Sequence, residues 1–442
     1  MDAWKLSSDF SEVPYWWEAW RPHDTLMSEV PDTTDVAIVG AGYAGLSCAL
    51  ELAKSGLHVT VLEAAYPGSG ASTLSGGQVS GGINVGKSMS GKRGAASSTA
   101  DKQRMLAEAA DSYTVFERIL SDNGIDCDYR KAGRINAFWL ESHVDAWRTR
   151  VDELNRYSQA GVRLLSKEQL RAELATGIYA GGALIERAGQ LHPSRMLGGM
   201  LDAARRAGAI VCSMARVTGL SRRAGGFRVT TARGAMTCRE VMICTNGYTD
   251  DLLPELRRAI VPVVSHQIAT EPLPADLRTS LIPLGRGVAE TRRVVNYYRY
   301  SPDGTRLLFG GRARFYALTR RESAKVLRAQ MVRRFPQLDG VRVSHSWGGS
   351  VAVTLDYLPH IGRTRDGVHY ALGCNGSGVV MMTYLGYKLA RLLIEHLPAE
   401  VSSYGTPMAT HPLYGGTPWF MPVLGSYYQV RDVWDKRREQ SR

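Results

Sequence analysis

The chain has few cysteines and no long apolar run. Its 442 residues include six cysteines, scattered without the paired spacing of a metal or redox motif. Several lie in apolar runs, so we expect reduced structural thiols rather than a disulfide framework. No stretch approaches the roughly eighteen apolar residues that a membrane-spanning helix needs, and residues 1–30 lack a charged start followed by an apolar core. We therefore expect a cytoplasmic protein without a membrane anchor.

Several patterns typical of other chemistry are also missing. The sequence has no zinc-ligand spacing, no evident Ser/His/Asp set and no paired carboxylates, which disfavours metal catalysis and hydrolysis. The net charge is +12, from 54 basic and 42 acidic residues. The basic residues are spread along the chain rather than gathered in one arm, so we expect no nucleic-acid partner. A positive potential of this size favours an anionic small substrate.

The most informative stretch is residues 35–64, which has the pattern of a strand, a glycine turn, a helix and a second strand. Gly40, Gly42 and Gly45 match a dinucleotide fingerprint, in which they give a tight turn, a close approach to a pyrophosphate and close packing of helix on strand. Glu63 ends the unit, 23 positions after Gly40. A carboxylate there can accept hydrogen bonds from a ribose and would repel a 2′-phosphate. An adenine dinucleotide of the FAD or NAD kind is therefore favoured over NADP.

A second glycine cluster at residues 68–78, with the sequence GSGASTLSGGQ, follows this acid directly. Its small residues and hydroxyls would let the backbone wrap a pyrophosphate and then pass close to a flat ring. The alternative is a flexible surface loop. Against that alternative, an NAD enzyme normally has a helix at this point of the chain, so the cluster favours a flavin dinucleotide.

A third cluster follows the predicted strand that begins at Val368. Gly373, Gly376 and Gly378 form a turn before a long predicted helix. A helix N-terminus aimed at a flavin ring would stabilise the negative charge that forms on its pyrimidine side on reduction. A second dinucleotide site is the alternative, but the order of the glycines fits that fingerprint poorly. Since the chain then has no obvious place for NAD(P)H, the electrons should come from the organic substrate.

Candidate substrate contacts lie in or directly after two predicted strands, and His192 is a further candidate. Tyr297, Tyr298 and Arg299 come from one strand and Arg312 follows the next. An arginine fork matches a carboxylate with two hydrogen bonds, and tyrosine hydroxyls can orient it. The alternative for each arginine is a surface position. His192, which precedes a proline, is either a pocket residue or a structural one.

The order of these units predicts a discontinuous cofactor domain with a substrate domain inserted into it, because the middle of the chain is rich in strands. A chain of this length also exceeds the size at which one core usually continues to grow. The predicted boundaries are an aromatic N-terminal extension at 1–30, an FAD-binding domain at 31–115, 185–255 and 345–400, a substrate-binding domain at 116–184 and 256–344, and a C-terminal extension at 401–442.

Motifs along nearly the whole chain resemble the D-amino-acid-oxidase-like flavoprotein family, and within it the bacterial gamma-glutamylputrescine oxidases. The resemblance implies a two-domain α/β (α+β) fold, with a glutathione-reductase-like Rossmann domain for FAD and an inserted antiparallel-sheet substrate domain. It also implies oxidation of a C–N bond to an imine. The matching motifs are PYWW at 14–17, GAS at 70–72, GGQ at 76–78, IDCDYR at 125–130, HP at 192–193, NYYR at 296–299, LLFGG at 307–311, FPQL at 335–338, WGG at 347–349 and YYQVRD at 427–432.

The motifs and the resemblance together assign candidate site residues. The expected cofactor-binding residues are Gly40, Gly42, Tyr43, Ala44, Gly45, Glu63, Ala64, Gly70, Ala71, Ser72, Leu74, Ser75, Gly76, Gly77, Gln78, Val217, Thr245, Asn246, Gly373, Asn375, Gly376, Ser377, Gly378, Val379 and Val380. The expected catalytic residues are Tyr298, Arg299, Arg312, Asn375 and Ser377. No metal site is expected.

The sequence departs from the family pattern beside the expected flavin. Leu74 and Ser75 stand where the family usually has Arg-Asn, and Asn375 and Ser377 lie in a turn that usually reads Ser-Gly-His-Gly. Some relatives attach the flavin covalently to a cysteine that lies just before the position of residues 354–356. This chain has no cysteine there, so we expect non-covalent FAD. Leu308 falls near the place of a lysine associated with dioxygen activation in sarcosine-oxidase relatives, a feature shared with the gamma-glutamylputrescine oxidases.

The expected reaction is oxidation of a small amine or amino acid, which could carry an acidic group held by Tyr298, Arg299 and Arg312. The imine would hydrolyse to an aldehyde or keto acid, and dioxygen would be reduced to hydrogen peroxide. One alternative is a dehydrogenase that passes electrons to a quinone or carrier protein. An alternative of another class is a flavoprotein that binds RNA. The sequence predicts no oligomeric state.

Overall fold

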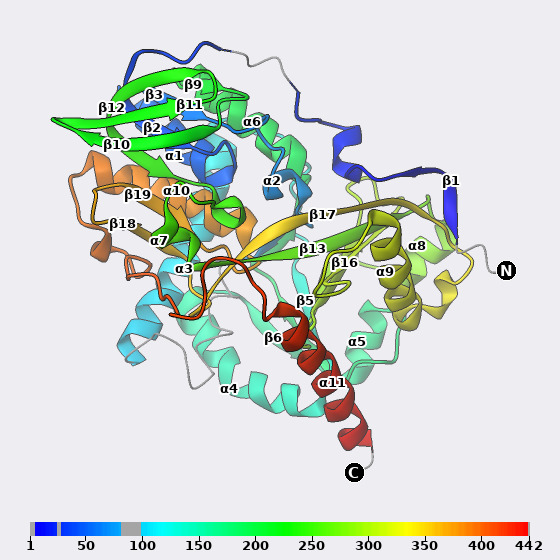
Figure 1. Ribbon diagram of the computed structural model, residues 1–442. Coiled ribbons are helices and arrows are strands. Elements are labelled where there is room, and N and C mark those ends of the chain that lie inside the picture. The colour runs from blue at the N-terminus through cyan, green and yellow to red at the C-terminus, as the bar shows by residue number, and fades with distance from the viewer. Residues whose placement is uncertain (1–4, 24–27, 81–98, 441–442) are drawn as a thin grey trace.

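Two large sheets lie side by side in the computed structural model, which describes residues 5–23, 28–80 and 99–440 (Figure 1). One sheet carries the fingerprint, and the other is formed mainly by the middle of the chain. In the described residues no helix is long and apolar enough to cross a membrane. All six cysteines are buried and unpaired, as expected for structural thiols.

The first sheet has eight described strands and a parallel centre. β12, β2, β3 and β9 lie side by side in parallel, and β10 and β11 extend the sheet as an antiparallel meander. β2 and β12 end in buried apolar runs, Val36–Val39 and Val241–Ile243, because helices cover parallel sheets on both faces. Its strands are β2 (Thr33–Val39), β3 (Val59–Leu62), β9 (Ile210–Cys212), β10 (Val217–Arg223), β11 (Gly226–Thr231), β12 (Gly234–Ile243), β18 (His360–Arg363) and β19 (His369–Leu372).

The second sheet has nine described strands in the order β1-β17-β13-β16-β15-β14-β5-β7-β6. Most neighbours are antiparallel, but the pairs β1–β17 and β14–β5 are parallel, so the expected antiparallel sheet is in fact mixed. Its strands are β1 (Leu6–Ser11), β5 (Arg134–Phe138), β6 (Val162–Leu165), β7 (Gly181–Ile185), β13 (Ile260–Thr270), β14 (Gly287–Glu290), β15 (Asn296–Tyr300), β16 (Leu307–Gly311) and β17 (Val343–Thr354). β4 (Gln78–Ser80) and β8 (Ala188–Gln190) form a separate two-stranded antiparallel sheet.

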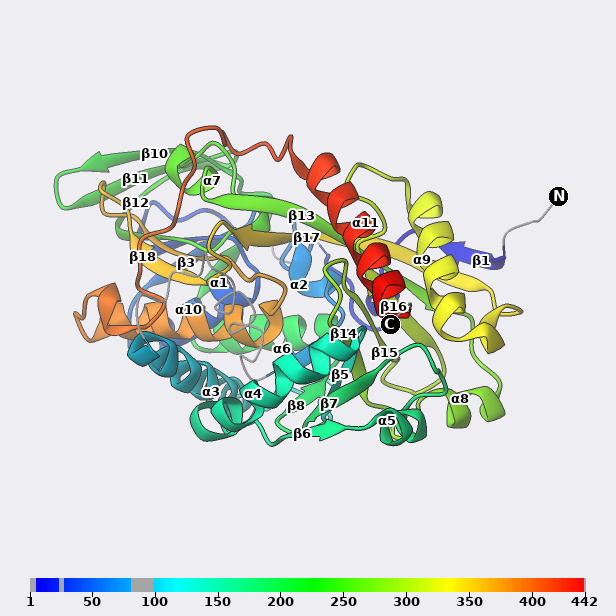
Figure 2. The ribbon, with the colours of Figure 1, turned by 90° about the horizontal axis from the view of Figure 1, so that it is seen from below.

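The helices divide between the two sheets (Figure 2). α1 (Tyr43–Lys54), α3 (Thr99–Asp122), α6 (Pro193–Arg206) and α10 (Gly378–Ile394) pack with the first sheet. α2 (Ala71–Leu74) and α7 (Pro254–Arg257) are single turns. The helices of the second sheet are α4 (Glu141–Ser158), α5 (Lys167–Glu173), α8 (Ala275–Leu281), α9 (Arg320–Arg334) and the C-terminal α11 (Met421–Gln440).

Most predicted helices are confirmed. Hydrophobic periodicity, with Pro193 as a start signal, predicts helices at about residues 101–120, 143–158, 167–174, 194–207 and 320–335. The structure has α3, α4, α5, α6 and α9 within a few residues of these stretches. Sequence signals also explain how α5 and α9 begin, because Ser166 with Gln169 and Thr319 with Glu322 form reciprocal capping boxes.

Two boundary expectations do not match the sheets. β1, which falls within the N-terminal extension predicted at residues 1–30, is an edge strand of the nine-stranded sheet. The predicted boundary at residue 345 falls inside β17, which pairs with β13 along its whole length. Pairing with β13 keeps all of β17 in the nine-stranded sheet, and this pairing cannot be derived from the local composition of residues 343–354.

Candidate active site

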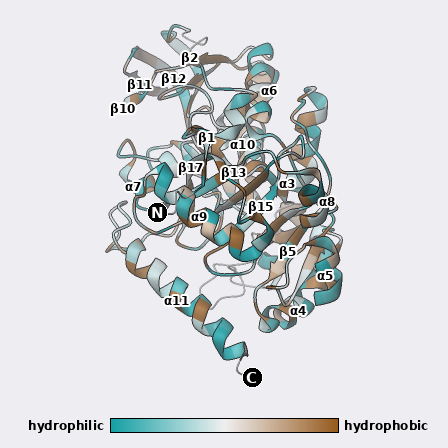
Figure 3. Ribbon diagram, turned by 90° about the vertical axis from the view of Figure 1, so that its right-hand side faces the viewer, coloured by the Kyte–Doolittle hydropathy of each residue, from teal (hydrophilic) through white to brown (hydrophobic). Residues whose placement is uncertain are grey.

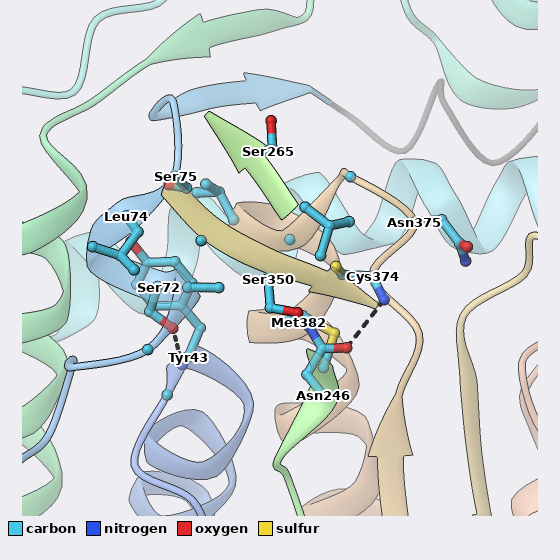
Figure 4. Close-up of a pocket in the computed structure, with 18 of the residues that line it drawn as sticks. Tyr43, Ser72, Leu74, Ser75, Asn246, Ser265, Ser350, Cys374, Asn375 and Met382 are labelled. Carbon is cyan, nitrogen blue, oxygen red and sulfur yellow. Dashed lines mark hydrogen bonds between the residues drawn. The ribbon is translucent and has the colours of Figure 1, made fainter. Parts of the chain in front are cut away.

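A large cavity of about 1920 Å³ extends from the fingerprint to the nine-stranded sheet. Its walls come from all three glycine clusters and from β13, β15 and the C-terminal helix α11. Figure 4 shows part of this wall, where β13, β17, α2 and the starts of α1 and α10 converge. The fold thus brings together motifs that are more than 300 residues apart in the sequence.

The fingerprint has the geometry that its glycines require. Gly40 has a φ of +103°, in the region that favours glycine. A side chain at Gly45 would bring its Cβ to 1.9 Å from the carbonyl oxygen of Gly40, so only glycine allows α1 to pack this closely on the turn. The Glu63 carboxylate accepts hydrogen bonds from the backbone N–H groups of Ala41 (2.8 Å) and Ala65 (3.0 Å). The acid therefore lies at the turn, beside the start of α1.

The second glycine cluster packs against the first. The Tyr43 N–H, at the start of α1, donates to Ser72 Oγ over 3.2 Å (Figure 4). Arg299 holds the far side of the cluster, because its guanidinium donates to the carbonyl oxygens of Gly77 (2.8 Å) and Leu191 (2.9 Å). The N-terminus of α1, with its free N–H groups, thus faces a loop rich in small residues, a suitable arrangement for a pyrophosphate.

The third glycine turn is tied to the turn at residues 243–248. The Asn246 side-chain oxygen accepts hydrogen bonds from the N–H groups of Gly373 (3.0 Å) and Cys374 (3.3 Å), the latter drawn in Figure 4. Asn375 Oδ1 accepts from the Thr354 N–H over 3.0 Å. Both asparagines have a φ of +46°, a conformation that asparagine tolerates better than most residues. These side chains fix the approach to the N-terminus of α10.

The wall from the nine-stranded sheet carries Tyr297, a candidate substrate contact from the sequence, together with Ser265 and Gln267, which no motif indicated. Tyr297 Oη and Ser265 Oγ lie 3.0 Å apart, and Gln267 Nε2 donates to the Leu74 carbonyl oxygen over 2.6 Å. A side chain at Gly310 would bring its Cβ to 2.3 Å from the Tyr297 ring, so this glycine makes room for the tyrosine. Burial raises the pKa of Tyr297 to about 12, so its hydroxyl is neutral near pH 7.

Tyr298 and Arg299 do not line the cavity, which corrects the expectation that they hold the substrate. Successive side chains of a strand point to opposite faces, and Tyr297 takes the cavity face. The Tyr298 ring stacks on Phe309, and its hydroxyl lies 3.0 Å from that of Tyr179 in the core. Burial lowers the pKa of Arg299 to about 9, and its guanidinium packs on the Trp16 ring. Arg299 is a positioning residue for the second glycine cluster.

His192 is also structural. Its Nδ1 accepts a hydrogen bond from the Arg195 N–H and caps α6, and its ring lies edge-on to Trp16. Burial, with Arg195 and Arg299 nearby, lowers its pKa to about 4, so the imidazole is neutral.

Most predicted site residues line the cavity, and the remainder support its walls. Those that line it are Gly40, Gly42, Tyr43, Ala44, Glu63, Ala64, Gly70, Ala71, Ser72, Leu74, Ser75, Gly76, Gly77, Gln78, Val217, Thr245, Asn246, Arg312, Asn375, Gly376, Gly378 and Val379. Those outside the lining are Gly45, Tyr298, Arg299, Gly373, Ser377 and Val380. Five of these six residues are next in the chain to a lining residue, and the sixth, Arg299, supports the second glycine cluster from behind.

The two leucines that depart from the family pattern belong to one apolar cluster. Leu74 packs against buried Trp16, Ala269, Leu308 and Trp347. The Leu74 carbonyl oxygen also accepts a hydrogen bond from Trp347 Nε1 over 3.1 Å. Positions 74 and 308, 234 residues apart in the sequence, therefore meet in one contact region. The aromatic N-terminal segment covers this region, a role that its sequence indicated only as packing on the core.

Several basic residues also belong to the lining of the cavity. Lys102, Arg134, Arg150, Arg292 and Arg293 contribute to its lining. Burial lowers the pKa of Arg134 to about 10, and its Nη2 donates to Asn136 Oδ1 over 2.9 Å. Three of these cations are ion-paired, Lys102 with Glu153 and both Arg292 and Arg293 with Asp432, and no motif pointed to these positions.

The cavity fits FAD in the chemistry of its lining. Backbone N–H groups at the start of α1 suit a pyrophosphate, and the Glu63 carboxylate lies where it can accept hydrogen bonds from a ribose. The third glycine turn and the start of α10 offer backbone dipoles beside the nine-stranded sheet. Among the described residues no cluster of three or more His, Cys, Asp or Glu side chains could hold a metal ion.

Comparison with known proteins gives one consistent result. The model of the DAO family, described as FAD dependent oxidoreductase, matches residues 35–392. The chain is 32% identical over 428 residues to the gamma-glutamylputrescine oxidoreductase of Escherichia coli (strain K12), covering 93% of this chain and 96% of that protein.

Solved structures agree on the fold. Glycine oxidase from Geobacillus kaustophilus superposes with a TM-score of 0.71 at 20% identity, covering 86% of this chain and 100% of that one. L-proline dehydrogenase from P. horikoshii gives a TM-score of 0.68 at 18% identity, covering 85% and 98%. The chain therefore belongs to the DAO family of FAD-dependent oxidoreductases, enzymes that act on amines or amino acids.

Proposed function

We propose that the protein oxidises the C–N bond of an amine or amino acid that carries an acidic group, a substrate of the gamma-glutamyl-amine class, with dioxygen as electron acceptor. The observation that carries this proposal is the position of Arg312. It lines the same cavity as the dinucleotide fingerprint, but from the nine-stranded sheet. A guanidinium there can bind a carboxylate with two hydrogen bonds. The name of the Escherichia coli relative supports the same substrate class.

The residues of the cavity can orient such a substrate without a dedicated base. When bound, FAD supplies the acceptor for a hydride from the carbon that bears the nitrogen. Ser265 and Tyr297 place two hydroxyls in the wall, and Tyr297 stays protonated at neutral pH because burial raises its pKa. A buried amine has a lowered pKa and loses its proton more readily. Release of the imine to water then gives a carbonyl compound and ammonia or an amine.

A dehydrogenase that uses a quinone or carrier protein is the second candidate. It is favoured by Leu308, which is 2% exposed within the apolar cluster around Trp347 and places no cation there. A cation near the reduced cofactor would stabilise the negative charge that forms when dioxygen accepts an electron.

The test is anaerobic mixing of the purified protein with gamma-glutamyl amines, free amines and amino acids, followed by the visible flavin spectrum. Bleaching by a gamma-glutamyl amine and peroxide formation after admission of air are expected. Bleaching with dye reduction but no peroxide would replace the oxidase with the dehydrogenase. Bleaching only by substrates without a carboxylate would refute the proposed substrate class. Retention of RNA at physiological salt would instead support the RNA-binding alternative.

A further inference from the structure

The C-terminal helix α11 lies outside residues 35–392, the part that the family model matches, yet it reaches the cavity. It runs along the outside of the nine-stranded sheet in both ribbon views (Figures 1 and 2). Leu424 and Tyr428 line the cavity. Residues four apart share a face of a helix, so one face of α11 is directed inward. Figure 3 shows hydrophobic and hydrophilic residues alternating along this helix.

The same face anchors the helix to the protein. Asp432, one turn beyond Tyr428, is only 3% exposed. Its carboxylate accepts hydrogen bonds from the backbone N–H groups of Arg293 (3.2 Å) and Val294 (3.1 Å), and both Arg292 and Arg293 form ion pairs with it. One turn further, Lys436 Nζ donates to the Trp139 carbonyl oxygen over 2.8 Å.

The start of the helix is held as closely. A side chain at Gly425 would bring its Cβ to 1.9 Å from Phe315, so glycine lets α11 pack directly on this ring. The Arg312 guanidinium lies over the same Phe315 ring, 5.7 Å from its centre. The position of Tyr428 is therefore determined by contacts on either side of it and is not that of a loosely attached tail.

Tyr357 joins this group from the turn that follows β17. It lines the cavity and has a φ of +60°, a strained conformation for a tyrosine. Burial and then the neighbouring Tyr428 raise the pKa of Tyr357, so its hydroxyl stays protonated at neutral pH. Two hydroxyl donors and one guanidinium thus border the same part of the cavity, the donor set that a carboxylate requires.

We propose that Tyr428 of the C-terminal helix, together with Arg312 and Tyr357, binds the distal carboxylate of the substrate and so determines which amines the enzyme accepts. This inference rests on the proposed function, because it names the part of the site that recognises the acidic group. Leu424, one turn earlier, would contact the aliphatic part of the same substrate.

The test compares Tyr428→Phe with Tyr427→Phe. Tyr427 is 53% exposed on the same helix and does not line the cavity, so its variant is a matched control. Loss of one hydrogen bond to a charged group predicts a rise of about tenfold or more in KM for a gamma-glutamyl amine, with kcat within about twofold. For an amine of the same length without the carboxylate, KM should not change, and the control should match wild type for both substrates.

A binding readout separates this inference from the proposed function. Glutarate, a dicarboxylate that cannot be oxidised at a C–N bond, should perturb the flavin spectrum with a Kd about tenfold higher in Tyr428→Phe than in Tyr427→Phe. Equal glutarate affinity and equal KM in the two variants would overturn the inference, as would an equal loss for the substrate without a carboxylate. If wild type oxidises no amine but binds glutarate through Tyr428, the proposed function fails and the carboxylate site stands.

Discussion

Removing one partner of the buried ion pair between Glu290 and Arg334 should destabilise the nine-stranded sheet strongly, because the other charge is then left buried without a partner. Arg334 Nε and Nη2 donate to the two oxygens of Glu290 over 2.8 and 2.9 Å. Glu290 is 0% exposed and Arg334 2% exposed. Tyr179 donates to the same carboxylate over 2.7 Å, and Arg334 also donates to Asn296 Oδ1. Every polar group of the pair is thus satisfied away from water.

The perturbation is Arg334→Met, which keeps the bulk of the side chain but leaves the Glu290 carboxylate buried. Arg292 is then the nearest cation, with its Nη1 3.9 Å from Glu290 Oε2. Removing one partner of a buried pair costs about 3–5 kcal/mol. For 442 residues the unfolding entropy near 60 °C is about 0.9 kcal/mol/K, so the Tm should fall by about 3–5 °C.

Differential scanning calorimetry of the FAD-loaded protein measures this shift. Arg148→Met is the control, because Arg148 and Asp145 form an ion pair that is 66% and 72% exposed, and it should cost less than about 1 kcal/mol. The double variant Glu290→Met with Arg334→Met should recover part of the loss, because no charge is then left unpaired. A Tm change of less than about 1 °C in Arg334→Met would refute the reasoning. Since Ala289 and Thr291 line the cavity, weaker substrate binding should accompany the loss.

Three further predictions concern pH and the cofactor. Burial lowers the pKa of His192, His266 and His345 to about 4. Between about pH 6.5 and 4 the unfolded chain therefore binds more protons than the folded protein, and the free energy of unfolding should decrease as the pH is lowered through that window. An unfolding midpoint that is equal at pH 7 and pH 5 would contradict this. Gly45→Val should lower the ratio of visible flavin absorbance to protein absorbance, since its Cβ meets the Gly40 carbonyl oxygen, and undiminished FAD content would show that the turn can adjust. Acid precipitation should release all the flavin into the supernatant, whereas yellow colour kept in the pellet would indicate a covalent bond.

Local sequence patterns were sufficient to predict elements whose main contacts are with residues close in the sequence. Residues 35–64 form a strand, a glycine turn, a helix and a second strand in the structure, as predicted. The glycine requirement there is local, because Gly45 packs on the carbonyl oxygen of Gly40 only five residues earlier. The caps of α5 and α9 are equally local, so their starts follow from short motifs.

Which of two neighbouring residues in a strand faces the cavity depended on tertiary structure. The sequence shows that Tyr297 and Tyr298 must point to opposite faces of a strand, but period-two alternation does not tell which face meets the cavity. The structure places Tyr297 in the wall and Tyr298 in the core. Arg299, expected at the substrate, instead holds the Gly77 carbonyl oxygen.

Contacts between distant segments could not be derived from the sequence at all. Asn246 reaches Cys374 across 128 positions, and Leu74 meets Leu308 in one apolar cluster. The sequence by itself determined the cofactor class and most helices, because those signals are carried by residues a few turns apart. Only the tertiary structure decided which side chains of the substrate wall face the cavity and that the C-terminal helix contributes to it, because pairing and packing between distant segments determine which face of each element is buried.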